Sequence, residues 1–236
     1  MADTHYNTDK IYQTLRQEIM LLTLEPGTLV SEGDISQRFS VSRTPVREVF
    51  KRLELEGLLE VRPQRGTFVS RIRLDSLYDL MFIRESVELA ALTELLARIE
   101  SRGIFKLRLQ IMEQEQLFEA ALSREEFVRS FLRLDNIFHQ TLYALVDRRG
   151  VWDFISTTRP HYNRFRILND TLNQHVCLDI LARHRDIVDA LEARDLPHMQ
   201  ELYKRPLYNS TENITRVVRA YPEFFCLTSN VSIHVE

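Results

Sequence analysis

Residues 31–69 read SEGDISQRFSVSRTPVREVFKRLELEGLLEVRPQRGTFV, and their pattern predicts two short helices followed by a two-stranded hairpin. Ser31 with Asp34 three residues later is typical of a helix start, and Ser42 can cap the second helix. Gly57 should end that helix. The apolar residues expected to face a core are Ile35, Phe39, Val46, Phe50 and Leu53.

The hairpin prediction rests on two short apolar segments around a basic turn. Leu59 and Val61 should pair with Thr67 and Val69 across the sequence RPQRG. Gly66 in this turn can take positive φ without steric cost. A helix-turn-helix followed by a wing is therefore the fold expected for this part of the chain.

The second helix carries a stripe of cations on the side away from its expected core. Arg43, Arg47 and Lys51 follow one another at i, i+4 and i+8. Such a helix can enter the major groove of DNA, where arginine makes bidentate bonds to guanine. Arg65 in the hairpin turn suits contact with the neighbouring minor groove or the backbone. The alternative is a solvated helix face with ordinary surface arginines.

The stretch VSRTPVREVFKRLELEGLLEVRPQRGTFV, residues 41–69, closely resembles the winged-helix signature of GntR-family bacterial transcription regulators. The resemblance extends over residues 8–72 and implies that the chain binds a double-stranded DNA operator. One departure is Gly33, because members similar to the fatty-acid regulator of this family often have an arginine there. The residues implied to lie against DNA are Ser42, Arg43, Thr44, Arg47, Lys51, Arg65 and Gly66.

The composition of the 236 residues, 44% hydrophobic and 28% charged, is typical of a soluble globular protein. The net charge is −3, but residues 36–73 hold nine basic and four acidic side chains, which suits a nucleic-acid binder. No apolar run is long enough to span a membrane, and no export signal is evident. Cys177 and Cys226 are expected to be reduced thiols. We therefore expect a cytoplasmic bacterial protein that associates with the nucleoid when bound to DNA.

Beyond Leu77 the chain shows helical periodicity and no strand-like alternation. A polar connector at residues 70–76 separates two expected domains, 1–72 and 73–236. Pro160 should kink the helix that contains it. Predicted helices cover residues 9–22, 76–100, 102–121, 124–147, 151–169, 174–193 and 196–219. The fold class expected is mainly α, with a winged helix-turn-helix (three helices plus a β-hairpin wing) joined to an all-α helical bundle.

A winged helix followed by a helical body of this size resembles the FCD branch of the GntR family. In that branch the body is a helical bundle that binds a small organic acid and often a metal ion, and the protein acts as a dimer. The resemblance therefore implies a homodimer that responds to a small carboxylate or sugar-acid effector and has no membrane partner.

The residues themselves indicate where a metal could bind. Asp135 and His139 stand at i, i+4 on an apolar helix side, and His184 lies on the apolar side of a later helix. A buried carboxylate needs a cation, a hydrogen-bond donor or a metal. The three side chains could bind one Zn, Ni, Mn or Fe ion, or form a hydrogen-bonded network without metal. The FCD resemblance implies a fourth ligand where this chain has Pro206, so three ligands would hold a metal more weakly and leave an open position.

An acid effector should be bound by arginine, whose guanidinium makes bidentate bonds to carboxylate. Arg84 stands at the family's arginine position in the first helix of the body, and it could instead bridge to Glu88. Arg159 and Arg166 lie beside Tyr162 on one helix face, and they could instead be ordinary surface residues. The candidate effector contacts are Arg84, Arg159, Tyr162, Arg166 and Asn213.

The sequence thus predicts a ligand-responsive transcription regulator, usually a repressor in this family, and not an enzyme. A metal-assisted hydrolase using Asp135, His139 and His184 is one alternative. No HExxH, GxSxG or Gly-rich phosphate loop supports it, and it leaves the basic wing without a role. A regulator that has lost effector control is another alternative, which Pro206 keeps open.

Overall fold

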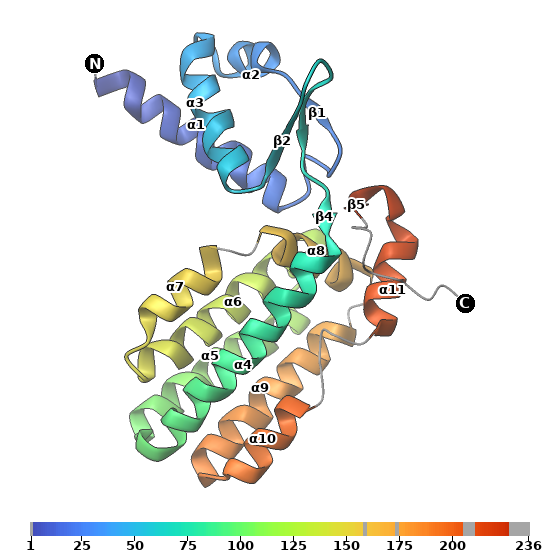
Figure 1. Cartoon of the computed structure of the whole chain (residues 1–236). Helices are drawn as coiled ribbons and strands as arrows, with labels where there is room; N and C mark the ends of the chain where they lie inside the picture. Colours follow the sequence, from blue (N-terminus) through green and yellow to red (C-terminus); the bar gives the residue numbers. More distant parts are fainter. Residues whose placement is uncertain (1, 158–159, 173–174, 205–210, 227–236) are drawn as a thin grey trace. The chain divides into compact units, whose positions relative to one another are not determined.

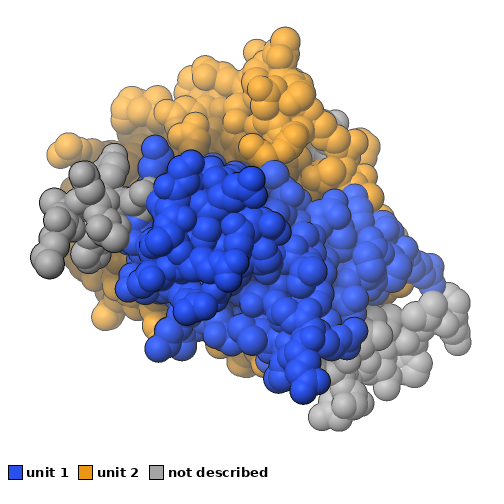
Figure 2. Space-filling model, turned by 90° about the horizontal axis from the view of Figure 1, so that it is seen from above, with its two compact units in different colours: residues 1–77, 160–165, 218–236 blue, residues 78–159, 166–217 orange. Residues whose placement is uncertain are grey.

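The computed structural model describes residues 2–157, 160–172, 175–204 and 211–226 (Figure 1). The chain divides into two compact units, coloured separately in Figure 2. The winged-helix unit takes in residues 1–77, 160–165 and the chain from 218 onward, and the helical unit takes in residues 78–159 and 166–217. Helix α8 (Pro160–Leu172) contributes residues 160–165 to the winged-helix unit and the rest to the helical unit.

The N-terminal part of the winged-helix unit combines helices with a small antiparallel sheet of order β1-β3-β2. Its elements are α1 (Ala2–Met20), β1 (Leu29–Val30), α2 (Glu32–Phe39), α3 (Arg43–Leu55), β2 (Leu59–Arg62) and β3 (Gly66–Val69). Helix α3 packs against both α1 and α2, because its residues Val46, Val49 and Leu53 are fully buried in one apolar core. This is the predicted winged helix-turn-helix.

Two serines begin the short helices, and only one of them acts as predicted. The Ser31 hydroxyl oxygen accepts a hydrogen bond from the backbone N–H of Asp34 at 3.0 Å, which caps α2. Ser42 stands at the N-terminus of α3, but its side chain makes no capping hydrogen bond there. Ser42 is exposed, and the first turn of α3 contains Pro45, whose missing N–H needs no partner.

The hairpin has the predicted register. Leu59 lies opposite Val69, and Val61 lies opposite Thr67. Gly66 takes a φ of +110°, as expected for this turn. Strand β1, which pairs with β3, was not predicted, because two residues are too few to show an alternating pattern.

The remaining helices are α4 (Leu74–Arg98), α5 (Ser101–Glu119), α6 (Arg124–Leu145), α7 (Arg149–Thr157), α8, α9 (His175–Ala193), α10 (Leu196–Lys204) and α11 (Thr211–Ala220). The predicted helices 151–169 and 196–219 are each divided into two, so their continuity was wrong. Pro160 is the first residue of α8 and does not kink a longer helix. Proline suits this position because the N–H it lacks would have no partner in a first turn.

A second small pairing also escaped prediction. Strand β4 (Ile72–Arg73) pairs in parallel with β5 (Phe225–Cys226), which follows the short 3₁₀ helix Pro222–Phe224. The expectation that no strand would occur beyond Leu77 was therefore wrong. Both cysteines are free thiols, with Cys177 buried and Cys226 exposed.

The helical unit is a bundle in which α5 packs against both α6 and α9 (Figure 1). Its largest apolar core joins residues of α4, α5, α6, α7, α9 and α10, among them Leu92, Leu107, Phe138, Leu142 and Leu191. The capping box predicted at the start of α6 is present, formed by Ser123 and Glu126. Within the described residues, no helix is long and apolar enough to cross a bilayer.

Candidate metal centre and DNA-contacting face

The residues predicted to contact DNA form an exposed surface of α3 and the wing. Arg43, Thr44, Arg47 and Lys51 are exposed on α3 while the opposite side of the helix is buried, and Ser42 is exposed before it. Arg65 and Gly66 are exposed in the hairpin turn. A helix packed on one side with cations on the other has the arrangement that a major groove requires.

One of these arginines is held by an acid in the absence of DNA. The Arg47 Nε donates a hydrogen bond to a Glu32 carboxylate oxygen at 2.9 Å, and the Arg47 side chain remains 67% exposed. An ion pair this exposed contributes at most about 1 kcal/mol, so phosphate or guanine can displace Glu32 at little cost. Gly33, next to Glu32, lies close to Arg43. A Cβ added to Gly33 would be 3.6 Å from Arg43 Nη2, which is an ordinary van der Waals contact.

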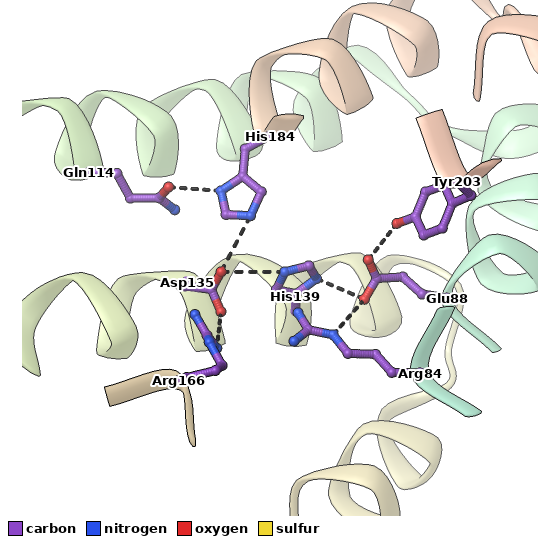
Figure 3. A network of polar contacts seen from close by, with 8 residues as sticks. All are labelled: Arg84, Glu88, Gln114, Asp135, His139, Arg166, His184 and Tyr203. Atoms are coloured by element: carbon purple, nitrogen blue, oxygen red, sulfur yellow. Dashed lines mark hydrogen bonds and ion pairs between the residues drawn. The ribbon is translucent and has the colours of Figure 1, made fainter. Parts of the chain in front are cut away.

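In the helical unit the three predicted metal-binding side chains meet in the core (Figure 3). Asp135 and His139 project from α6 and His184 from α9. Asp135 Oδ1 lies 3.6 Å from His139 Nε2 and 3.5 Å from His184 Nε2. One ligand atom of each residue lies within 4.8 Å of the other two, and all three side chains are buried. This spacing suits a single divalent ion between them.

Further buried partners hold the opposite atoms of all three side chains. His184 Nδ1 lies 2.8 Å from the Gln114 side-chain oxygen, which can only accept, so the proton is on Nδ1 and the Nε2 lone pair faces Asp135. His139 Nδ1 lies 2.9 Å from a carboxylate oxygen of Glu88. Arg166 Nη1 donates to Asp135 Oδ2 at 2.8 Å. Outer partners of this kind fix the ring orientation in metal centres.

The acid that holds His139 is itself part of a buried network (Figure 3). Arg84 Nε lies 3.6 Å from the Glu88 carboxylate, and the Tyr203 hydroxyl donates to the other Glu88 oxygen. Burial alone would raise the pKa of Glu88, but His139 and then Arg84 and Tyr203 hold it below its usual range. The carboxylate therefore stays charged beside His139 Nδ1, which lies 2.9 Å away without hydrogen-bond geometry.

The protonation states suit a metal centre. Burial is the largest influence on Asp135 and opposes its charge, but Arg166 and His139 outweigh it and keep the pKa of this carboxyl well below its ordinary value. Burial lowers the pKa of His184 to about 3, although Asp135 acts in the opposite direction. Asp135 is therefore an anion and His184 a neutral imidazole near pH 7, the forms that bind metal.

Asp135 Oδ1 provides a direct test of fit. Among the described residues it is buried without a hydrogen-bond partner, although it faces two imidazole nitrogens. At least one of these is the lone-pair nitrogen of a neutral ring, which repels a carboxylate oxygen. A cation between them would satisfy all three atoms, so this donor set fits a divalent ion with mixed N and O preference.

The predicted effector residues are distributed differently from expectation. Arg166 is not a surface residue, because its side chain is 1% exposed and binds Asp135. Arg84 is buried beside Glu88, the bridge that the sequence left open. Tyr162 is buried and Asn213 is partly buried, whereas Arg159, like Pro206, lies outside the described residues.

Several polar residues of the centre were missed by sequence reasoning. Gln114, Glu88 and Tyr203 lie on three other helices, and a single sequence gives no signal that they would meet His139 and His184. Asn169 and Asp170 are also fully buried on α8, and their side-chain oxygens have no hydrogen-bond partner in the described part of the chain. Their position three and four residues after Arg166 could have indicated that they share its side of the helix.

A winged helix with an exposed cationic face and a helical unit with a buried metal-type centre define a class of DNA-binding transcription regulators. The chain belongs to the GntR family of bacterial regulatory proteins: the gntR family model matches residues 7–69, and the FCD domain model matches residues 79–207. This confirms the resemblance proposed from the sequence.

Two similar proteins illustrate the membership, and one solved structure shows a similar fold. An uncharacterized HTH-type transcriptional regulator in an unstable DNA locus of Streptomyces ambofaciens is 34% identical over 228 residues, 95% of this chain and 93% of the relative. The HTH-type transcriptional repressor RspR of Escherichia coli K12 is 31% identical over 217 residues, 92% of each chain. A GntR regulator structure from Rhodococcus sp. RHA1 has a TM-score of 0.66 at 24% identity, covers 91% of this chain and 98% of its own, and supports the fold.

Proposed function

We propose that this regulator is a repressor whose operator affinity is controlled by a small organic or sugar acid bound in the helical unit. The observation that carries the proposal is the convergence of Asp135, His139 and His184 within 4.8 Å in the core. The repressor RspR, similar over most of its length, supports the direction of control. A ligand controls DNA binding only if it prefers one of two conformations of the protein.

The centre would hold one divalent transition metal, Zn, Ni, Mn or Fe, through those three side chains. When bound, the metal supplies a Lewis-acidic position to which a carboxylate of the effector can attach. Arg84 and Asn213 are candidate contacts for the same molecule. Asn169 and Asp170 add buried polar atoms in need of partners, which favours an effector that carries hydroxyl groups as well as a carboxylate.

DNA binding would use the exposed cationic face of α3 for base edges and the wing residues for the flanking groove. We also propose a homodimer, since two half-sites on a duplex require two recognition helices. The helical unit offers an apolar stripe for such contact on α5. Phe105, Leu109 and Met112 stand at i, i+4 and i+7 and are 64%, 42% and 51% exposed.

The test is metal content and its effect on Trp152. Trp152 is the chain's single tryptophan, is 6% exposed, and stacks 6.3 Å from the His139 ring. We expect near-stoichiometric metal in protein purified without chelator or affinity tag, and Ni²⁺ should quench Trp152 fluorescence in the stripped protein.

The variant His184→Gln should lose both properties, while His198→Gln, at an exposed histidine of α10, should keep them. A protein that stays metal-free after incubation with Zn, Ni and Mn would contradict the metal centre. Operator binding unaffected by any acid would then favour a regulator without effector control.

A further inference from the structure

Arg164 is a fully buried arginine of α8 that binds Ser70, the residue directly after strand β3 of the wing. Its side chain is 0% exposed, and its Nη1 donates to the Ser70 carbonyl oxygen at 2.6 Å. Its Nη2 lies 3.1 Å from the Ser70 hydroxyl oxygen and 3.0 Å from His161 Nδ1. Its Nε donates to the Pro160 carbonyl oxygen at 3.2 Å. A charged group buried this deeply is stable only with such partners, so the contact is specific and strong.

Ser70 in turn is bound to the end of the recognition helix. Its hydroxyl donates to the Gly57 carbonyl oxygen at 2.5 Å, and its backbone N–H donates to the Leu58 carbonyl oxygen at 3.0 Å. Gly57 and Leu58 are two of the three residues between α3 and β2. The N-terminal half of α8 is therefore linked, through the Arg164 side chain and Ser70, to the segment that joins α3 to the wing.

The same helix carries the arginine that binds the metal-type centre. Arg166 follows Arg164 by two residues, about 200° around a helix, so the two side chains leave α8 on nearly opposite sides. Arg166 holds Asp135 Oδ2 at 2.8 Å, with both side chains buried. Within three residues, α8 thus has one buried attachment to the winged-helix unit and one to the helical unit.

We propose that Arg164 couples the Asp135–His139–His184 centre to the DNA-binding unit, with α8 as the rigid element that carries the displacement. This rests on the proposed function, because an ion at the centre changes the charge that Arg166 faces. A change of position at Arg166 moves the backbone of α8, and Arg164 transfers the movement to Ser70 and the end of α3. Packed helices change position in discrete steps, so a small shift suffices.

Hydrogen exchange of the full chain, measured with and without zinc sulfate, tests the coupling without knowledge of the operator or effector. In the wild type, zinc should change exchange in peptides covering residues 132–142 and 180–188 and also in peptides covering 57–70. In Arg164→Gln, the change at the centre should remain, and the change at 57–70 should fall at least tenfold. Ser70→Ala, which keeps the carbonyl contact, should give an intermediate result and serves as the milder variant if Arg164→Gln is poorly folded.

Arg194→Gln is the matched control. Arg194 also donates to two backbone carbonyls, those of Leu96 and Ile99, and neither Arg194 nor these two partners belongs to α8. This variant should respond to zinc as the wild type does. A zinc response at the centre that never reaches 57–70, or reaches it equally in Arg164→Gln, would overturn the coupling and leave the metal centre intact.

A metal-free comparison separates failure of the coupling from failure of the metal centre. If zinc changes no exchange rate at residues 132–142, the proposal of a metal centre is wrong. The coupling is then tested by comparing hydrogen exchange in metal-free Arg164→Gln with that in the metal-free wild type. The link requires that this variant accelerate exchange at residues 166–172 and 132–142 as well as at 57–70. If exchange accelerates only at residues 57–70 and 160–164, Arg164 stabilises its immediate surroundings and does not couple the two units.

Discussion

The Arg166–Asp135 pair gives the strongest quantitative prediction for the helical unit. The Asp135 side chain is 0% exposed and that of Arg166 is 1% exposed, so neither charge has water as an alternative partner. Replacing Arg166 with methionine, which is similar in length, would leave the Asp135 carboxylate buried without its main counter-charge. Breaking a buried pair in this way costs about 3–5 kcal/mol of the free energy of unfolding.

The assay is urea unfolding of wild type and Arg166→Met, each with EDTA and with zinc. In EDTA the deficit should be about 3–5 kcal/mol. In zinc it should shrink, because the metal supplies positive charge to Asp135 in place of the guanidinium. Arg108→Met is the matched control, since Arg108 pairs with Asp189 and Glu192 at 2.6 Å but is 37% exposed. Its deficit should stay below about 1 kcal/mol.

Two results would refute this reasoning. A deficit below about 1 kcal/mol in EDTA would mean that Asp135 is neutral or solvated, contrary to its burial and lowered pKa. An equal deficit with and without zinc, in protein shown to bind zinc, would mean that metal and guanidinium do not act on the same carboxylate.

Three further predictions concern the wing, the recognition helix and α8. Arg47→Ala should weaken binding to an operator selected from random DNA by about 10- to 100-fold, measured by fluorescence anisotropy, and an unchanged affinity would exclude base contact by Arg47. Gly66→Ala should lower the free energy of unfolding by about 1–3 kcal/mol, because φ is +110° and the new Cβ would lie 2.8 Å from Leu29 Cδ1. Adding Leu29→Ala to Gly66→Ala should recover only the part of the lost stability that comes from the contact with Leu29, as measured by thermal unfolding. Burial, and then Asp135, raise the pKa of Asp170 to about 7, so the wild type should lose up to about 4 kcal/mol of stability as pH rises from 4 to 8. Asp170→Asn should lack this loss, and parallel stability profiles for both proteins would disprove the assignment.

The winged helix was predictable because its signals are local. The hairpin register follows from alternation within eleven residues and from a glycine that must take positive φ, and both are visible in the sequence. The two-residue strands β1 and β5 were not predictable, since each depends on a partner far away in the chain. Pro160 was misread because proline disrupts a helix interior but favours a first turn, and only the fold decides which applies.

The metal-type centre was predictable for a different reason. Asp135 and His184 lie on apolar helix sides, where a polar group needs a specific partner, so periodicity alone marked them. Arg166 was placed in the effector site because its true partner is 31 residues earlier, and no spacing rule connects the two. Gln114 gave no signal, since a polar residue on a helix is most often exposed. Glu88 was marked only as a possible partner of Arg84 at i, i+4, and nothing in the sequence connected it to His139.

The charges around the centre bear on which effector it can accept. Two carboxylates, Asp135 and Glu88, and two guanidiniums, Arg166 and Arg84, are buried there together, so these four groups balance without a metal. Asp170, whose pKa is raised to about 7, adds only part of a negative charge near neutral pH. A divalent ion would add two positive charges where desolvation makes an uncompensated charge costly. An anion beside the ion would remove most of that cost, and a carboxylate attached at the open position would do so at the shortest distance. Metal and acid should therefore raise each other's affinity by the same factor, as linkage requires. This balance therefore favours the acidic effector proposed above.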